Sequence, residues 1–217
     1  MEISKKWAKS LVYILAYCEL IWDFAFCLSF VFSEDEEIIM ALERRELQEK
    51  IFQGRKIYFS GSIRGVPHPD PDFFHSLISY MKENGALVLS EHVGIKNVEE
   101  RNSLFVKLSG IDRSGELFDP ASKIREANLL WLNEATHCIA VCDTASSGVG
   151  MEVQYALLKY RMGLNLTPVL CLVRADLFSD VSNMVKGISQ KDSSVAFVRK
   201  YKDLKNAEEK IAVFLSC

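Results

Sequence analysis

The chain has 217 residues, which is enough for one well-packed domain with appendages and does not require two domains. Charged residues make up 25% of the chain and hydrophobic residues 49%, as in ordinary globular proteins. The net charge of -3 excludes broad electrostatic binding to a nucleic-acid polymer, but a small anion remains a possible ligand because one or two arginines or a helix terminus can bind it.

Residues 1–54 differ in composition from the rest of the chain and are expected to form an extension. Three lysines precede an apolar run at 11–32, a pattern typical of a signal sequence or a membrane anchor. Glu19 and Asp23 interrupt the run, and each carboxylate near a bilayer centre costs roughly 2.5 to 3.5 kcal/mol on insertion scales. The run is therefore either a membrane-directing segment or a helix outside the domain, and the charged residues 33–53 predict a connecting helix.

We expect a cytoplasmic or nuclear protein, with tethering to a membrane through residues 11–32 as the alternative. The six cysteines show no Cys-x-x-Cys pair and no other metal-ligand spacing, so neither a metal site nor a disulfide framework is expected. No cofactor is expected either. Cys138, Cys142 and Cys171 lie in apolar strand-like runs, where cysteine packs as a small hydrophobic residue.

From Lys56 onward, short apolar runs alternate with amphipathic segments. Five strands separated by helices predict an α/β fold, a Rossmann-like or flavodoxin-like doubly wound five-stranded parallel sheet with an N-terminal helical extension. The domain is expected over 55–217, and the polar residues 94–118 predict a loop or a short helical insertion. The expected strands are 56–60, 86–90, 137–142, 167–173 and 195–198, and the expected helices are 73–83, 119–133, 149–162, 178–187 and 204–215.

The first candidate binding element is the loop that follows the strand at 56–60. Its glycines let a ligand approach closely, and its main-chain amides, hydroxyl and guanidinium are groups that bind phosphate. The spacing is neither a Walker loop nor GxGxxG, and an ordinary turn is the alternative interpretation. The residues of this loop are Gly61, Ser62, Ile63, Arg64 and Gly65.

Two further segments are expected at the carboxyl edge of the sheet, where ligands bind in doubly wound folds. His92, at the end of the second strand, either contacts a base or phosphate or is a hydrogen-bonded structural histidine. Ser146, Gly148 and Glu152 follow the third strand. Glu152 near a helix N-terminus is expected to stay ionised and suits a nucleophile that attacks an anomeric carbon. A glutamate that only compensates the helix dipole is the alternative interpretation.

Together these segments resemble the nucleoside 2-deoxyribosyltransferase superfamily, and most closely its 2'-deoxynucleoside 5'-phosphate N-hydrolases. The shared motifs run in family order across about residues 56 to 215. They are Tyr58-Phe-Ser-Gly-Ser-Ile-Arg-Gly65, Ser90-Glu-His-Val93, Leu129-Leu-Trp-Leu132, Ser146-Ser-Gly-Val-Gly-Met-Glu152 with Tyr155-Ala156, and Ser182-Asn-Met-Val-Lys-Gly187. Residues 1–54 and the insertion after Gly94 lie outside the resemblance.

The resemblance implies a Rossmann-like enzyme that hydrolyses the N-glycosidic bond of a 2'-deoxynucleoside 5'-monophosphate. Its products would be a free base and 2-deoxyribose 5-phosphate. By position, Glu152 resembles the nucleophile that forms a deoxyribosyl-enzyme, and Tyr58 the tyrosine beside the sugar. The loop from Gly61 to Gly65 and Ser146 would bind phosphate and sugar. In the family a partner subunit closes the site, and Ser182 and Met184 match that element, so a homodimer is implied.

One residue departs from the family pattern. The family carries an aspartate directly before its Leu-x-Trp-Leu segment, where it orients the nucleophile and assists the departing base, and this chain has Asn128. An amide still forms hydrogen bonds but does not relay a proton. The alternative to the hydrolase is therefore a catalytically weak protein that binds nucleotides as a sensor or interaction module. A transferase acting on unphosphorylated nucleosides is a third option, which is disfavoured because Ser62, Arg64 and Ser182 offer phosphate contacts.

Overall fold

The computed structural model describes residues 46, 51–63, 68–110, 120–189 and 195–216. Contacts divide the chain into two units, 1–47 and 48–217, and the described residues belong almost entirely to the second. The apolar run at 11–32 lies outside the described residues, as does most of the expected connecting helix. None of the helices in the described segments is long and apolar enough to cross a membrane.

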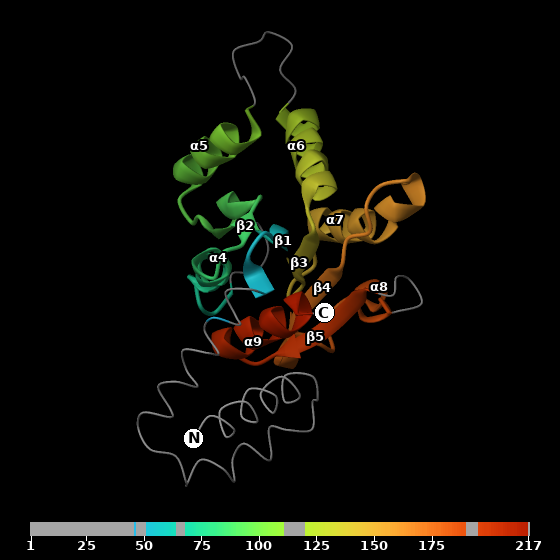
Figure 1. Cartoon of the computed structure of the whole chain (residues 1–217). Coiled ribbons are helices and arrows are strands. Elements are labelled where there is room, and N and C mark those ends of the chain that lie inside the picture. Colours follow the sequence, from blue (N-terminus) through green and yellow to red (C-terminus); the bar gives the residue numbers. More distant parts are fainter. Residues whose placement is uncertain (1–45, 47–50, 64–67, 111–119, 190–194, 217) are drawn as a thin grey trace, which may run out of the picture. The chain divides into compact units, whose positions relative to one another are not determined.

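The second unit is built on a sheet of five parallel strands, which confirms the predicted fold class (Figure 1). The strand order is β2-β1-β3-β4-β5. The winding reverses between β1 and β3, so the switch point, where doubly wound sheets bind ligands, lies at the carboxyl ends of these two strands. The strands are β1 (Lys56–Gly61), β2 (Leu87–Val88), β3 (His137–Val141), β4 (Val169–Arg174) and β5 (Ala196–Tyr201).

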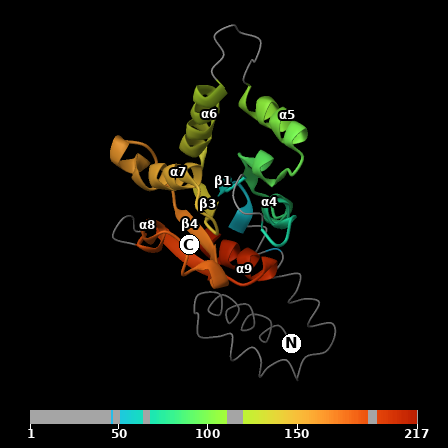
Figure 2. The same ribbon diagram turned by 180° about the vertical axis from the view of Figure 1, so that it is seen from behind.

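Helices cover both faces of the sheet (Figures 1 and 2). Successive residues of a strand point to opposite faces. Ile139 of β3 accordingly packs in the core cluster with α4 and α9, whereas Cys138 and Ala140 pack in the cluster with α6 and α7. The helices are α4 (Phe73–Glu83), α5 (Val98–Ser109), α6 (Pro120–Glu134), α7 (Ser147–Leu158), α8 (Asn183–Lys186) and α9 (Leu204–Leu215).

The boundaries of α4 and α9 are those predicted from the sequence. In α4 the apolar residues Phe73, Leu77, Ile78 and Met81 are buried at helical spacing, which gives the helix one face for the core. The expected insertion contains a full helix, α5. Its N-cap is Asn97, whose side chain accepts hydrogen bonds from the amides of Glu99 and Glu100.

Several predicted boundaries are wrong; among the strands, β4 starts at Val169 instead of 167, and β5 runs to Tyr201 instead of ending at 198. The second strand covers only Leu87–Val88, and Glu91–Gly94 forms a 3-10 helix instead of a strand end. The helix expected at 178–187 is limited to α8, after a 3-10 turn at Ala175–Leu177. Helix α7 starts at Ser147, two residues earlier than predicted, because Ser146 is its N-cap and accepts a hydrogen bond from the Val149 amide.

Phe52, assigned to the extension by the sequence analysis, is fully buried in the core cluster of the second unit. Arg55 donates a hydrogen bond from Nη2 to the carbonyl of Leu215 at the end of α9, at 3.2 Å. The segment that leads into β1 is therefore part of the packing of the sheet domain.

Candidate active site

The centre of the candidate site is the carboxylate of Glu152 on α7. Ser60, near the end of β1, donates from Oγ to Glu152 Oε2 at 2.5 Å. Asn128 of α6 donates from Nδ2 to Oε1 at 3.4 Å. The hydroxyl of Tyr58 on β1 is a third hydrogen-bond partner of this carboxylate. Two elements beside the switch point, β1 and α6, thus aim polar side chains at one partly buried carboxylate on α7.

Burial dominates the electrostatics of this group. It raises the pKa of Glu152, and the hydrogen bonds from Ser60 and Tyr58 oppose that increase. The helix dipole, which the sequence suggested as the cause that keeps Glu152 ionised, is not among the causes of this shift. Because α7 begins at Ser147, Glu152 lies beyond the first turn, where the dipole has its main effect.

Tyr58 is almost fully buried, and its pKa lies well above the usual value because of burial and the nearby Glu152 carboxylate. The phenol therefore stays protonated at neutral pH and donates to Glu152. Cys138, beside Tyr58 in the same core cluster, has its thiol pKa raised by burial and behaves as an inert apolar group.

Only one of the two polar groups in the Asn128 side-chain amide has a hydrogen-bond partner among the described residues. Its Nδ2 group donates to Glu152, whereas its Oδ1 atom is buried and has no hydrogen-bond partner among the described residues. Glu126 does not substitute for a family aspartate, because it is exposed and pairs with Lys123 at 2.9 Å. The buried amide oxygen is left as an acceptor beside the carboxylate.

His92 lies in an aromatic cluster and not at a strand end. Its ring centroid is 5.0 Å from that of Phe105 and 5.5 Å from that of Trp131. Burial lowers the pKa of His92 to about 4, so the imidazole is neutral at physiological pH. Its Nδ1 atom is buried and has no partner within the described part of the chain. The structural alternative, a histidine satisfied by a hydrogen bond at that atom, is thus not observed.

The loop after β1 is described only up to Ile63. Gly61 is explained by packing, since a Cβ there would lie 2.7 Å from Cε2 of Phe74. Ser62 is half-buried and Ile63 is 43% exposed. Arg64 and Gly65 lie outside the described residues.

The remaining residues predicted for the site lie at the N-termini of α7 and α8. Ser146 caps α7, and Gly148 is in its first turn, where a Cβ would meet nothing closer than Ser146 Oγ at 3.9 Å. Ser182 caps α8 by accepting from the Met184 amide at 3.2 Å. The Met184 side chain is 80% exposed, so in the single chain it belongs to the surface.

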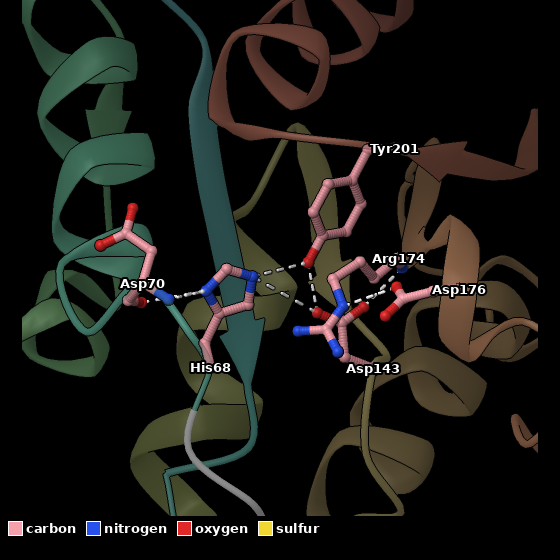
Figure 3. Close-up of polar contacts among 6 residues, drawn as sticks. All are labelled: His68, Asp70, Asp143, Arg174, Asp176 and Tyr201. Atoms are coloured by element: carbon pink, nitrogen blue, oxygen red, sulfur yellow. Dashed lines mark hydrogen bonds and ion pairs between the residues drawn. The ribbon is translucent and has the colours of Figure 1, made fainter.

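Sequence reasoning missed Ser60 and a second polar cluster at the same edge of the sheet (Figure 3). Asp143, just after β3, accepts from the main-chain amide of Arg174 at 2.7 Å and from the hydroxyl of Tyr201. His68 Nε2 lies 3.3 Å from that hydroxyl and 4.0 Å from Asp143 Oδ2. The cluster ties the ends of β3, β4 and β5 to the segment that follows the candidate phosphate loop.

This arrangement suits attack by a carboxylate on a carbon centre. Glu152 is partly buried and is held by three hydrogen-bond donors, from Ser60, Asn128 and Tyr58. The described segments contain no group of three or more His, Cys, Asp or Glu side chains placed to hold a metal ion.

Comparisons with known proteins give the family. No protein-family model matches the chain. A protein of Nematostella vectensis named 2'-deoxynucleoside 5'-phosphate N-hydrolase 1 is 32% identical over 149 residues, which cover 69% of this chain and 86% of the relative. The 5-hydroxymethyl-dUMP N-hydrolase of Homo sapiens is 30% identical over 66% of this chain and 72% of its own length. The 5-hydroxymethyl-dUMP N-hydrolase of Mus musculus is 31% identical over 60% of this chain and 64% of its own length.

A solved structure, the CMP N-glycosidase of Clostridium botulinum, aligns with 74% of this chain and 99% of its own at a TM-score of 0.46 and 13% identity. The curated relatives are nucleotide N-hydrolases by name, and the N. vectensis protein is matched over most of its length. The chain belongs to the family of 2'-deoxynucleoside 5'-phosphate N-hydrolases.

Proposed function

We propose that this protein hydrolyses the N-glycosidic bond of a 2'-deoxynucleoside 5'-monophosphate, giving a free base and 2-deoxyribose 5-phosphate. The observation that carries the proposal is the partly buried Glu152 carboxylate with Tyr58, Ser60 and Asn128 around it, at the switch point of the sheet. The names of the relatives, which are N-hydrolases of deoxynucleoside monophosphates, support the same substrate class.

In the proposed reaction, a Glu152 oxygen attacks C1' of the deoxyribose, and the bond from C1' to the base nitrogen breaks. The base leaves with the bonding electron pair and takes a proton from water. A second water then attacks C1' of the glycosyl-enzyme and gives its proton to the hydroxide left by the first, which releases the sugar phosphate and regenerates the carboxylate. Tyr58, held protonated, donates to Glu152 and lies beside the sugar.

We infer that the remaining predicted residues bind the substrate. Gly61 to Gly65, with Ser62, Ile63 and Arg64, would hold the phosphate together with Ser146 and Gly148 at the start of α7. His92 would contact the base and not the phosphate, since a neutral buried imidazole is a poor phosphate ligand. Ser182 and Met184 would complete the site of a partner subunit in a homodimer.

The direct test is to incubate the full chain with deoxynucleoside monophosphates and to follow the free base by chromatography. Glu152→Ala is expected to reduce release to the uncatalysed background while retaining nucleotide binding by calorimetry. Wild-type protein that binds nucleotides without releasing any base would refute the hydrolase. An undiminished rate in Glu152→Ala would refute the nucleophile assignment alone.

A second candidate function is favoured by one observation. Among the described residues that hydrogen-bond to Glu152, none combines a proton with a pKa near neutrality, because Asn128 is an amide, Ser60 is an alcohol and Tyr58 holds its proton. A protein with this site binds nucleotides and turns them over slowly or not at all, as a sensor or interaction module. Asn128→Asp distinguishes the two functions: a weak hydrolase is expected to gain base release, and a sensor that lacks other catalytic groups is not.

The transferase alternative predicts base exchange on unphosphorylated deoxynucleosides. The same chromatographic assay, run with a deoxynucleoside and a second free base, detects the exchanged nucleoside. We expect none, because a hydrolase that uses the phosphate for binding discriminates against a substrate without it.

A further inference from the structure

A line of polar contacts joins α6 to α7 and to the 3-10 turn that continues α7 (Lys159–Met162). Glu152, Tyr155 and Lys159 are spaced at i, i+3 and i+7, so they lie on one face of this helical segment. Glu152 contacts Asn128, as described above, and the Tyr155 hydroxyl donates to Asn133 Oδ1 at 2.8 Å. Lys159 makes the third contact, at the far end of the line from the candidate active site.

Lys159 is an unusual lysine because it is fully buried. Its ammonium group donates to the carbonyls of Leu132 at 2.6 Å, Asn133 at 3.4 Å and Ala135 at 3.4 Å. No carboxylate pairs with it among the described residues. These carbonyls belong to the end of α6, where the last turn lacks helical donors and carries partial negative charge. The buried cation therefore caps one helix from the end of the other.

The cap determines where α6 lies relative to α7. Asn128 is one helical turn before Leu132, and its contact with Glu152 is 3.4 Å, near the outer limit of a hydrogen bond. Such a contact does not hold the helices together by its own strength. Without the ammonium group, the carbonyls of Leu132 and Asn133 would lose this donor and that of Ala135 would keep only Thr167, and we expect the end of α6 to move to satisfy them.

We propose that Lys159 is a positioning residue that holds Asn128 against the Glu152 carboxylate. The kinetic part of this inference rests on the proposed function, and its structural part does not. The separation between Asn128 and Glu152 is set by the ammonium cap at the opposite end of the helix pair. Lys159 touches no substrate and acts only through the position of α6.

A double-mutant cycle tests the proposal, with Lys159→Met, Asn128→Ala and the combined variant. Lys159→Met keeps the length of the side chain and removes its donors. We expect it to lower kcat for base release about ten- to a hundredfold, since displacements of about 1 Å have effects of that size, with a smaller change in KM. In the Asn128→Ala background the same change is expected to have little further effect.

Thr167→Val is the matched control. Thr167 is buried and donates from Oγ1 to the Ala135 carbonyl at 3.3 Å, so its replacement removes a hydrogen bond at the same end of α6 without touching the face of α7. We expect it to lower the melting temperature and to leave kcat near the wild-type value. The proposal is overturned if Lys159→Met and Asn128→Ala act additively, if Lys159→Met leaves kcat unchanged in folded protein, or if Thr167→Val reproduces its effect.

A measurement without turnover separates this inference from the proposed function. The 13C signal of the Glu152 carboxyl can be assigned by its absence in Glu152→Gln and followed against pH. Lys159→Met is expected to raise the pKa of this carboxyl, because a donor is withdrawn, and to have no such effect in the Asn128→Ala background. If the wild-type protein releases no base, the hydrolase proposal fails, but this titration still tests the role of Lys159. An unchanged pKa of the Glu152 carboxyl in Lys159→Met would refute that role.

Discussion

At the scale of single residues, Glu152 is subject to two opposing effects. Burial favours its protonated form, whereas donors from Ser60 and Tyr58 favour the carboxylate. A nucleophile needs the ionised form. The two donors therefore stabilise the carboxylate that the reaction requires, although burial opposes ionisation. The raised pKa also means that ionised Glu152 destabilises the folded chain once the pH exceeds that pKa, which is a common compromise at active sites.

The acid side of the pH profile follows from this balance. Protonation of Glu152 removes the nucleophile, so kcat/KM is expected to fall as the pH decreases through a pKa above that of an exposed glutamate. Ser60→Ala removes a donor that lowers this pKa, and the acid limb should therefore move to higher pH. The shift is measured from initial rates of base release between about pH 4 and pH 8, the range in which carboxyls and histidines titrate.

Ser122→Ala is a suitable control for that experiment because Ser122 is exposed on α6, away from the carboxylate. Its profile should superimpose on that of the wild-type protein. An acid limb that stays in place in Ser60→Ala, or moves to lower pH, contradicts the role assigned to the Ser60 hydroxyl.

The resemblance to the N-hydrolase family identified Glu152, Tyr58 and Asn128 as a group, and the structure brings all three together. Ser60 has no comparable signal, since a serine at the end of an apolar strand is common and its partner is 92 positions away. Asp143, Tyr201 and His68 were missed for the same reason: the contact between Tyr201 and His68 spans 133 positions. Register and packing across the sheet, which no local pattern encodes, create these contacts.

At the scale of elements, two glycines expected to serve a ligand differ in their surroundings. Gly61, at the end of β1, is required by the ring of Phe74 on α4, so packing of a helix against the sheet accounts for it. At Gly148, in the first turn of α7, a Cβ would make only an ordinary contact with Ser146 Oγ at 3.9 Å. Packing within the chain gives no reason for a glycine there, and we propose that this glycine allows the close approach of a substrate.

The two positions therefore have opposite expected effects when changed to alanine. Gly61→Ala should destabilise the chain by about 1 to 3 kcal/mol through overpacking against Phe74. Gly148→Ala should stabilise it by about 0.4 to 1 kcal/mol, because alanine favours the helix and restricts the unfolded chain. Urea unfolding curves measure both changes. In the base-release assay, Gly148→Ala is expected to raise KM despite its stability, and an unchanged KM would remove Gly148 from the proposed site.

Elements with strong periodicity were predictable and weakly periodic ones were not. Residues 73–83 and 204–215 have an apolar face at helical spacing, and both helices have the predicted boundaries. Residues 98–109 bury only Phe105, so their apolar signal is weak, although Asn97 and Gly110 are typical helix-flanking residues that could have revealed α5. The segment at 178–187 has apolar residues without a sustained helix, since tertiary packing decides its conformation.

At the scale of the whole molecule, the candidate site lies at one edge of the sheet and is lined by β1, α6 and α7. Met184 on α8 is 80% exposed, which is unusual for a large apolar side chain and suits a contact with a second subunit. A site shared between subunits has a distinctive consequence, because two inactive chains with defects in different parts of the site can restore each other.

Mixing two inactive variants tests this arrangement. Glu152→Ala removes the proposed nucleophile, and Met184→Glu places a charge in the element expected to close the partner's site. After unfolding and refolding together in equal amounts, random pairing in a symmetric dimer leaves about a quarter of all sites free of both defects, so about a quarter of wild-type base release should return. Glu152→Ala mixed with Asn128→Ala is the control: both defects lie in the site of one chain, every site of the mixed dimer keeps one of them, and no activity should return. Mixed dimers detected by native mass spectrometry without recovered activity in the first pair would show that Met184 does not complete the site of a partner.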